Sequence, residues 1–496
     1  MSSALLYRNT IPNISATIFR KSGLDGIEKL LPNYRFAGDW FFYAYLLRSG
    51  TMSFIAESLN VFRRHAKGVT RQKSKTPEYL IELANVRKYI VENYPITHNQ
   101  ISTANKFLDK DYKVTRVKKN STYSKIKPIL KQVEAVTTQR KCIGIITTNN
   151  GSYTGGSEVL WRETADMLAK QKHKVVVLIK KWQPEPEFIQ KMRLKGIDVY
   201  FKEDNGFENF LQHRPDLVLV SIGDQDEGID YYRELKKKKI PYAIVNQLTK
   251  EARFWPIREN QTKDLTTAYK GAKSVFFTCN NNHKVMESRL GAKIKNSRIH
   301  FNPYHIDRNL VPKFPSTNKG MSIAIPSKLL FIHKGQDLIF DMIEKYPVWK
   351  TRELNFNFYG EGPDRINIER RISELGLSNC HLHGRLDDIG DIWKTNHALL
   401  MPSRMEGMPI MMISAMLSAR TCIATDIGGH AEVIQDEKSG YIIPDPSVDD
   451  LNMTLEKAFQ NRKNWKKMGE LSRKTILEYL PEEPVENFVG QLNEIW

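Results

Sequence analysis

Residues 142–179 read CIGIITTNNGSYTGGSEVLWRETADMLAKQKHKVVVLI, and this stretch decides the fold. The apolar runs Cys142–Thr148 and Lys174–Ile179 each predict a buried strand. Between them, four residues recur at the spacing of one helix face: Leu160, Thr164, Met167 and Leu168. A strand, a glycine-rich turn, a helix and a second strand together predict a β-α-β unit of a parallel sheet.

The same alternation continues to the end of the chain. Further strands are predicted at Asp216–Ser221, Tyr242–Val245, Ser274–Thr278, Ser322–Ile325, Leu354–Tyr359, Ala398–Met401 and Thr421–Thr425. Helices are predicted at Gln336–Lys345, Arg365–Leu375 and Pro409–Ala419. The series restarts near Met321, so we expect an α/β fold with two doubly wound halves that face a cleft.

Four segments follow from this pattern. Residues 1–71 are the first, and residues 72–140 are a basic, partly helical connector. The two doubly wound halves span residues 141–310 and 311–496, and the last helix is a candidate to cross back to the first half. The helical part of the connector is predicted from five apolar positions at helical spacing: Leu80, Leu83, Val86, Tyr89 and Ile90.

Composition narrows the classes of function. The 496 residues suggest about three domains, and the 41% hydrophobic and 26% charged residues are ordinary for a globular protein. No apolar run reaches the ~18–20 residues of a membrane span, and the first residues lack the pattern of a secretory signal. The four cysteines lie far apart and no HxxxH pair occurs, so we expect no metal site, no disulfide framework and a cytoplasmic location.

The net charge of +19 is unevenly distributed. Between Lys106 and Lys141 there are eleven basic and three acidic residues. This segment carries no nucleic-acid-binding motif, so we expect no nucleic-acid partner. Clustered Lys and Arg favour an anionic membrane surface instead, because each gains about 1 kcal/mol near such lipids. A peripheral position on the inner face of the cytoplasmic membrane is therefore one expectation.

Two groups of residues at predicted strand ends are suited to bind phosphate. Gly155 and Gly156 lie where a strand turns into a helix, and glycines there let the backbone and the helix N–H groups approach an anion. The alternative is a tight turn in which Ser157 caps the helix. Lys328 and Lys334 follow another predicted strand, where two ammonium groups can neutralise a diphosphate without metal. The alternative is a pair of solvated surface lysines.

A third group is Pro402–Pro409, which reads PSRMEGMP. In it the carboxylate of Glu406 precedes a glycine turn and a helix, so turn amides can hold a phosphate while the carboxylate contacts sugar hydroxyls. The alternative is an acidic residue that stabilises the positive end of the helix. A fourth group, Asp426–Gly429 with Glu432, is either a loop that faces the same cleft or only a turn.

The order of these segments resembles the group 1 glycosyl transferases, family 4, which have the GT-B fold. The resemblance covers Lys141–Trp496 and is carried by HKGQDLI, FYGEGPD, HGRLDDIGDIW, LLMPSRMEGMPIMMISAM and ATDIGGHAEVIQDEKSGYIIP. It implies a hexosyltransferase that moves a sugar from a nucleotide-diphosphate-sugar with retention of anomeric configuration and without a metal cofactor. It also implies a glycan or lipid-linked acceptor, as in bacterial surface polysaccharide synthesis.

The resemblance assigns roles residue by residue. Gly155 and Gly156 would face the donor phosphates, and Lys334 would hold the diphosphate. Glu406 would contact the donor sugar, and we count Lys334 and Glu406 as the catalytic residues. The backbone that follows, at Gly407, Met408 and Pro409, would approach the donor.

Three positions depart from the family pattern. Lys328 stands where the family usually has Arg, and Ser414 stands where it has a second Glu that binds the ribose. The family's histidine in the first half has no clear match, and Asn246 or Gln247 lies in that region as a candidate on the acceptor side. A catalytically impaired protein that only binds the donor is therefore an alternative.

The first segment carries a second resemblance, to the tail of a family 2 glycosyltransferase with the GT-A fold. The matching stretches are Asn13–Lys21, Gly38–Phe42 and Leu59–His65. It implies that Asp39 is a remnant of the acceptor base, or that another chain completes the enzyme; the alternative for Asp39 is capping a helix. A metal-dependent transferase completed by another chain is the corresponding alternative function, because in that family the metal-binding Asp-x-Asp precedes such a tail. Separately, Asp109/Asp111 and Asp224/Asp226 match an Asp-x-Asp pattern, and the second follows a predicted strand, where a metal site can lie.

Overall fold

The computed structural model describes the greater part of the chain. The described residues are 24–47, 76–94, 104, 140–149, 151, 153, 155–251, 255, 259–304, 306–318, 320–386 and 388–496. The chain divides into two compact units, Met1–Ile146 with Thr164–Leu219, and Thr147–Glu163 with Val220–Trp496. The basic segment between residues 106 and 139, the Asp109/Asp111 pattern, and the stretches Asn13–Lys21 and Leu59–His65 lie outside the described residues.

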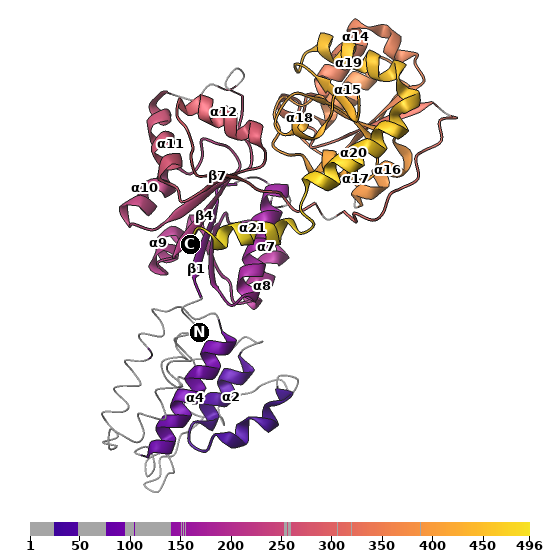
Figure 1. Ribbon diagram of the computed structural model, residues 1–496. Coiled ribbons are helices and arrows are strands. Elements are labelled where there is room, and N and C mark those ends of the chain that lie inside the picture. The colour runs from indigo at the N-terminus through magenta and orange to yellow at the C-terminus, as the bar shows by residue number, and fades with distance from the viewer. Residues whose placement is uncertain are drawn as a thin grey trace. The chain divides into compact units, whose positions relative to one another are not determined.

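Strands and helices alternate from residue 142 onward, as the sequence predicts (Figure 1). The strands are β1 Cys142–Thr147, β2 Lys174–Ile179, β3 Asp198–Phe201, β4 Leu217–Ile222, β5 Tyr242–Asn246, β6 Val275–Phe277, β7 Ser297–Ile299, β8 Met321–Pro326, β9 Leu354–Tyr359, β10 Cys380–Gly384, β11 Ala398–Met401, β12 Thr421–Thr425 and β13 Gly440–Ile443.

Helices connect these strands. The α-helices are α7 Gly156–Lys170, α8 Glu187–Leu194, α9 Gly206–Gln212, α10 Ile229–Lys237, α11 Glu259–Gly271, α12 Asn280–Leu290, α13 Phe331–Lys334, α14 Gln336–Lys345, α15 Arg365–Glu374, α16 Ile392–Thr395, α17 Ile410–Leu417, α18 His430–Val433, α19 Val448–Gln460, α20 Trp465–Tyr479 and α21 Pro484–Asn493. No helix within the described ranges combines the length and the apolar character needed to cross a bilayer.

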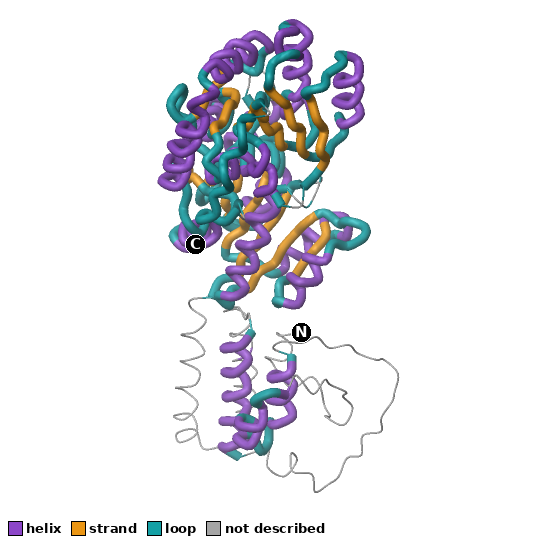
Figure 2. Tube along the Cα trace, turned by 90° about the vertical axis from the view of Figure 1, so that its right-hand side faces the viewer, coloured by secondary structure: helices purple, strands orange, loops and turns teal. Residues whose placement is uncertain are grey.

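The strands form two separate parallel sheets (Figure 2). The first has the order β3-β2-β1-β4-β5-β6-β7, and the second has the order β10-β9-β8-β11-β12-β13. Ile145 pairs with Val177, which confirms that the two strands of the opening β-α-β unit are parallel neighbours. Strands β1, β2, β4 and β5 are buried along their whole length, which explains why their sequences are continuous apolar runs. The α/β fold class with two doubly wound halves is thus confirmed.

Both sheets reverse their strand order at one point. The reversal lies between β1 and β4 in the first sheet and between β8 and β11 in the second. Ligands of open α/β sheets bind outside the carboxyl ends of the strands that flank such a point. The loops after β1, β8 and β11 carry Gly156, Lys334 and Glu406, so the sequence-predicted groups stand where this rule places a ligand.

A small helical core precedes the sheets. It contains α2 Gly38–Leu46 and α4 Pro77–Asn93, and the second of these confirms the helix predicted in the connector. Glu82 of α4 accepts hydrogen bonds from the backbone N–H groups of Arg35, Phe36 and Ala37, and so holds the segment that leads into α2. Asp39 lies in the first turn of α2, where it accepts from the N–H of Trp40 at 2.8 Å.

The last helix, α21, packs against strands of the first sheet. Phe488 contacts the ring of Phe276, with ring centroids 5.0 Å apart. Gln491 donates to the backbone oxygen of Ile299 at 3.0 Å, and Glu494 forms an ion pair with Arg298. The end of the chain therefore returns from the second sheet to β6 and β7 of the first.

Candidate functional site

The two side chains expected to act on the donor are in direct contact. Nζ of Lys334 lies 2.7 Å from Oε1 of Glu406, and the hydroxyl of Ser403 donates to the same oxygen at 2.9 Å. The Glu406 side chain is only 7% exposed, whereas that of Lys334 is 24% exposed. The buried carboxylate holds the ammonium in place, while the ammonium still reaches solvent and can meet an anion.

The loop that carries Glu406 is tied to the turn that carries Lys334. The backbone N–H of Arg404 donates to the carbonyl of His333 at 2.9 Å. The Arg404 guanidinium donates to the carbonyl of Phe331 at 2.7 Å and forms an ion pair with Asp337 in the first turn of α14. Arg404 and Asp337 stand inside the motifs PSRMEGMP and HKGQDLI, but no role was predicted for either of them.

Gly335 makes the close approach of these two segments possible. Its φ of 65° lies in the left-handed region, and it ends the short helix α13. A methyl group built on it would lie 2.0 Å from the carbonyl oxygen of Pro402. Only glycine fits both conditions, so Lys334 is fixed next to the β11 loop by the backbone itself.

The glycine turn after β1 contacts the same region. A methyl group built on Gly156 would lie 2.6 Å from Cδ1 of Ile410, the first residue of α17. A methyl group on Gly407 would lie 2.5 Å from the carbonyl oxygen of Gln247. Helix α7 begins at Gly156, so Ser157 lies inside its first turn and is not its N-cap. Gly156, Glu406 and Gly407 thus belong to one neighbourhood.

Positive charge gathers around His333. Burial lowers the pKa of His333, and Lys334, Lys250 and Lys328 lower it further, while Glu406 opposes them. Lys328 is exposed just beyond β8, and Gln336 donates to its backbone carbonyl at 2.9 Å. An imidazole whose proton is repelled by three ammonium groups marks a place where an anion is stabilised.

The two acceptor-side candidates differ in their environment. Asn246 is fully buried and donates to the hydroxyl of Tyr269 at 2.9 Å, so its side chain belongs to the core. Gln247 accepts from Asn302 at 2.8 Å, and its own Nε2 is buried without a hydrogen-bond partner among the described residues. Of the two, only Gln247 offers an unused donor near Gly407.

Ser414, the position at which the family has a second Glu, has no exposed surface. It is fully buried in α17, and its hydroxyl accepts a hydrogen bond from Nε1 of Trp393 at 2.7 Å. This contact engages one side of the Ser414 hydroxyl with the indole, and the donor-binding role of Ser414 stays a prediction. Among the described residues its geometry is that of a core contact.

The fourth predicted group, Asp426–Gly429 with Glu432, contacts the loop that carries Gly407. The N–H of Gly429 donates to the carbonyl of Gly407 at 2.8 Å. Glu432 accepts from the N–H of Asn281, the first turn of α12, at 2.8 Å, and from the hydroxyl of Tyr479 at 3.0 Å. A hollow of about 490 Å³ adjoins these residues and is also lined by Asn280, Lys284, Asp426, Gly428 and Ala431.

The Asp-x-Asp pattern after β4 is engaged with basic side chains. Asp224 forms an ion pair with Lys250. Asp226 is half-buried, and its pKa is raised by burial and by Asp224. Within the described residues, no three His, Cys, Asp or Glu side chains gather in the arrangement of a metal site.

Comparison with known proteins gives the family of the second half. Residues 308–475 match the family model described as Glycosyl transferases group 1. An uncharacterized glycosyltransferase of Methanocaldococcus jannaschii is 28% identical over 139 residues, which cover 28% of this chain and 38% of that protein. The poly(ribitol-phosphate) alpha-N-acetylglucosaminyltransferase of Staphylococcus aureus is 28% identical over 188 residues, which cover 37% of each. The matched part is therefore less than two fifths of the length of these relatives.

A solved structure extends the likeness to the fold. HepE of Anabaena, in complex with UDP, has a TM-score of 0.56 to this chain at 14% identity, and the match covers 71% of this chain and 98% of HepE. This likeness shows that the chain has the GT-B fold, with one doubly wound unit for each sheet. The sequence match to Glycosyl transferases group 1 thus lies within residues 308–475, and the likeness to HepE extends over the fold of both sheets.

Proposed function

We propose that this chain transfers a sugar from a nucleotide-diphosphate-sugar to a glycan or lipid-linked acceptor, with retention of configuration and without a metal ion. The observation that carries the proposal is the 2.7 Å contact between Lys334 and Glu406, in a neighbourhood where Lys328 and Lys250 add positive charge. Relatives named as glycosyltransferases, one of them acting on poly(ribitol-phosphate), support the class of reaction.

Each candidate residue has a separate role in the proposed transfer. When the bond between the sugar and the diphosphate breaks, negative charge builds on the leaving oxygen, and Lys334 and Lys328 stabilise it. Glu406 keeps Lys334 oriented and offers its second oxygen to the sugar. The acceptor hydroxyl forms the new bond to the anomeric carbon, and its proton passes to the departing diphosphate. Gln247, with its unused amide donor, orients the acceptor.

The direct test is a screen of nucleotide sugars with the purified chain, followed by product analysis. Lys334→Ala should lower turnover by orders of magnitude while the circular dichroism spectrum stays unchanged. The matched control is Lys345→Ala in the neighbouring helix α14, where the side chain pairs with Asp449 at the surface. Turnover of Lys334→Ala equal to that of the control would remove the proposed phosphate role.

Metal independence has its own test. Activity should persist in EDTA, because ammonium groups replace the cation at the diphosphate. Loss of activity in EDTA that Mn²⁺ restores would favour the metal-dependent alternative at Asp224 and Asp226. The variant Asp226→Asn then separates the two, since it should leave a metal-independent enzyme active.

A second candidate function is that of a donor-binding protein with little transferase activity, and the environment of Ser414 favours it. Its hydroxyl is engaged with Trp393, so the carboxylate that the family resemblance places there has no replacement at that position. A protein that binds the donor but turns it over slowly fits this departure. Calorimetry with the same nucleotide sugars identifies it, because binding would then occur without product.

A further inference from the structure

The loops that enter three neighbouring strands of the first sheet are rich in lysine. We use the term lysine edge for eight residues: Lys236, Lys237, Lys238, Lys239, Lys270, Lys273, Lys293 and Lys295. All eight are exposed. They lie at or just beyond the ends of α10, α11 and α12, immediately before β5, β6 and β7. The segments that carry them, 236–241, 270–274 and 291–297, contain no acidic residue.

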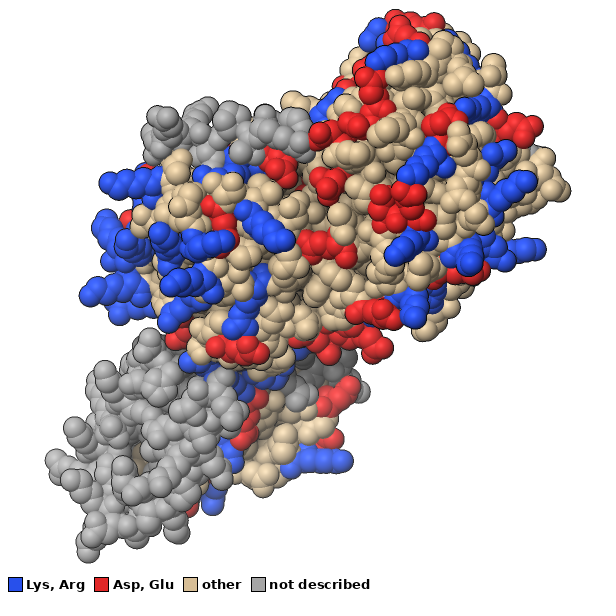
Figure 3. Space-filling view, turned by 45° about the horizontal axis from the view of Figure 1, so that its top comes forward, with Lys and Arg blue, Asp and Glu red and all other residues tan. Residues whose placement is uncertain are grey.

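These loops form one continuous surface. Strands β5, β6 and β7 are parallel neighbours, so their amino ends meet at one edge of the sheet. The N–H of Lys273 donates to the carbonyl of Tyr242 at 2.7 Å, and the N–H of Val275 donates to the carbonyl of Asn296 at 3.0 Å. Figure 3 shows Lys and Arg crowded on the side where Figure 1 places α10 and α11.

Few carboxylates neutralise this surface. Glu234 lies within ion-pair distance of Lys237 and Lys238, and Glu287 pairs with Lys293. In the described part of the chain, the other five lysines have no ion-pair partner: Lys236, Lys239, Lys270, Lys273 and Lys295. By contrast, the loop at the opposite end of β4 carries three carboxylates: Asp224, Asp226 and Glu227. The first sheet is thus positive at this amino edge and acidic after β4.

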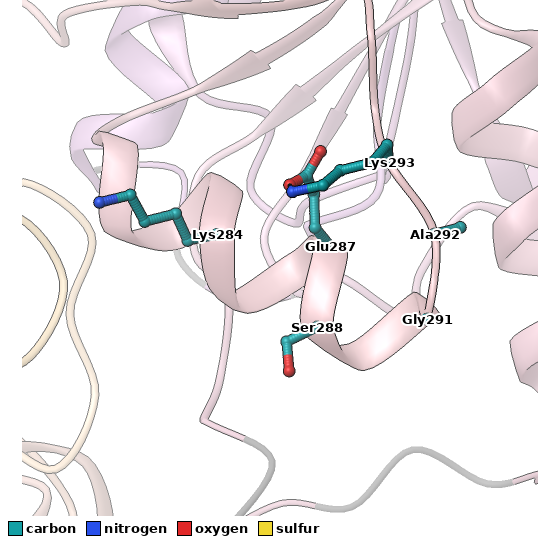
Figure 4. A pocket seen from close by; sticks show the side chains of 6 residues that line it. All are labelled: Lys284, Glu287, Ser288, Gly291, Ala292 and Lys293. Atoms are coloured by element: carbon teal, nitrogen blue, oxygen red, sulfur yellow. Dashed lines mark hydrogen bonds and ion pairs between the residues drawn. The ribbon is translucent and has the colours of Figure 1, made fainter.

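The use of lysine rather than arginine at this edge favours a broad anionic surface over a single phosphate group as its partner. All eight side chains are lysines, which carry a compact charge on a flexible stem and lack the planar fork with which arginine recognises one phosphate. A hollow beside the edge, of about 400 Å³, is lined by Lys284, Glu287, Ser288, Gly291, Ala292 and Lys293 (Figure 4). Its Lys293 is paired with Glu287, so it is no pocket for a single anion.

We propose that the lysine edge binds the chain to an anionic phospholipid bilayer. Diffuse charge on three adjacent loops matches a broad sheet of negative headgroups better than it matches one small ligand. The inference does not depend on the proposed transfer reaction, because the edge and the donor-binding loops lie at opposite ends of the strands. It also differs from binding through the basic segment before residue 140.

The test measures flotation of the full chain with vesicles of phosphatidylcholine alone and of phosphatidylcholine with phosphatidylglycerol. One variant removes the five unpaired charges by Lys236→Gln, Lys239→Asn, Lys270→Gln, Lys273→Gln and Lys295→Gln. Asn is chosen at position 239 because φ is 55° there, a value that Asn tolerates. The control variant changes five exposed lysines elsewhere to Gln: Lys438, Lys463, Lys466, Lys467 and Lys474.

We expect binding to anionic vesicles only, lost at high salt. Each lysine near such a surface contributes about fivefold, so the edge variant should bind more than about 100-fold more weakly. The control variant should bind as the unchanged chain does. Equal binding to neutral vesicles, or full binding by the edge variant, would overturn the proposal. So would binding to soluble polyphosphate without binding to anionic vesicles. Donor affinity measured by calorimetry should be the same in all three proteins.

Discussion

Arg404 holds both carboxylate oxygens of Asp337, with Nη1 2.7 Å from Oδ1 and Nη2 2.6 Å from Oδ2. This two-pronged contact joins the loop after β11 to the first turn of α14. Because Lys334 and Glu406 stand on the two joined segments, the contact sets the distance between them.

Arg404→Lys should weaken donor binding by about tenfold, because a single ammonium cannot hold both oxygens and the loop with Glu406 shifts. Calorimetry with UDP measures the effect. Arg370→Lys is the matched control, since Arg370 contacts both oxygens of Glu374 on the exposed face of α15. Unchanged UDP affinity in Arg404→Lys would show that this contact does not position the site.

Ser414→Ala should lower stability and leave donor affinity within about twofold. The substitution leaves the buried N–H of Trp393 without its acceptor, which costs about 1–3 kcal/mol. Urea unfolding and calorimetry with UDP measure the two quantities on the same preparation. The reverse pattern, with unchanged stability and weaker UDP binding, would support the donor-binding role of Ser414.

His333 should report the bound diphosphate. Its pKa is lowered by burial and then by Lys334, Lys250 and Lys328, and an anion among these lysines cancels their repulsion. UDP should therefore raise the pKa of His333, measured by NMR titration, and UDP should bind more tightly as the pH falls through the range in which His333 takes up its proton. His397, at the amino end of β11, serves as the control and should not respond. A constant pKa of His333 would place the diphosphate elsewhere.

Buried histidine should make the fold sensitive to acid. Burial lowers the pKa of His300 from 6.5 to about 3. The unfolded chain takes up the proton first, so stability is fully present above pH 6.5 and declines as the pH falls toward 3. The decline between pH 7 and pH 5 is about 2 kcal/mol from this residue alone. Unfolding of His300→Gln should show a flatter pH dependence; an unchanged slope would contradict the assignment.

Most buried strands were predicted, because their sequence patterns indicate a strand clearly. β2, β9, β11 and β12 begin and end at the predicted residues. β2 and β11 are continuous apolar runs, which suit a covered strand, whereas β9 alternates asparagine with leucine and phenylalanine at the period of a strand. β3, β7, β10 and β13 were not predicted. β3, with the sequence DVYF, is only half-buried, and β10 alternates histidines with apolar residues, so neither presents an apolar run.

Candidate site residues at the ends of strands could be predicted from the sequence. Contacts between side chains that lie far apart in the sequence could not. β8 and β11 are neighbours in the second sheet, so topology brings the loops with Lys334 and Glu406 together. Gly156 follows β1 of the first sheet and meets this region through Ile410. The engagement of Ser414 by Trp393 joins residues 21 positions apart through a contact that no local pattern encodes. The ion pair between Arg404 and Asp337, which joins the loop after β11 to α14, likewise could not be predicted from either motif alone.

The length of strand β5 separates the lysine edge from Gln247, the proposed acceptor-side residue. Lys239 precedes the strand and Gln247 follows it, and five residues of strand span about 17 Å. If the lysine edge rests on headgroups as proposed, with β5 perpendicular to the bilayer, Gln247 stands about that far above the lipid. The two proposals together then favour an acceptor glycan that already extends well beyond the headgroups.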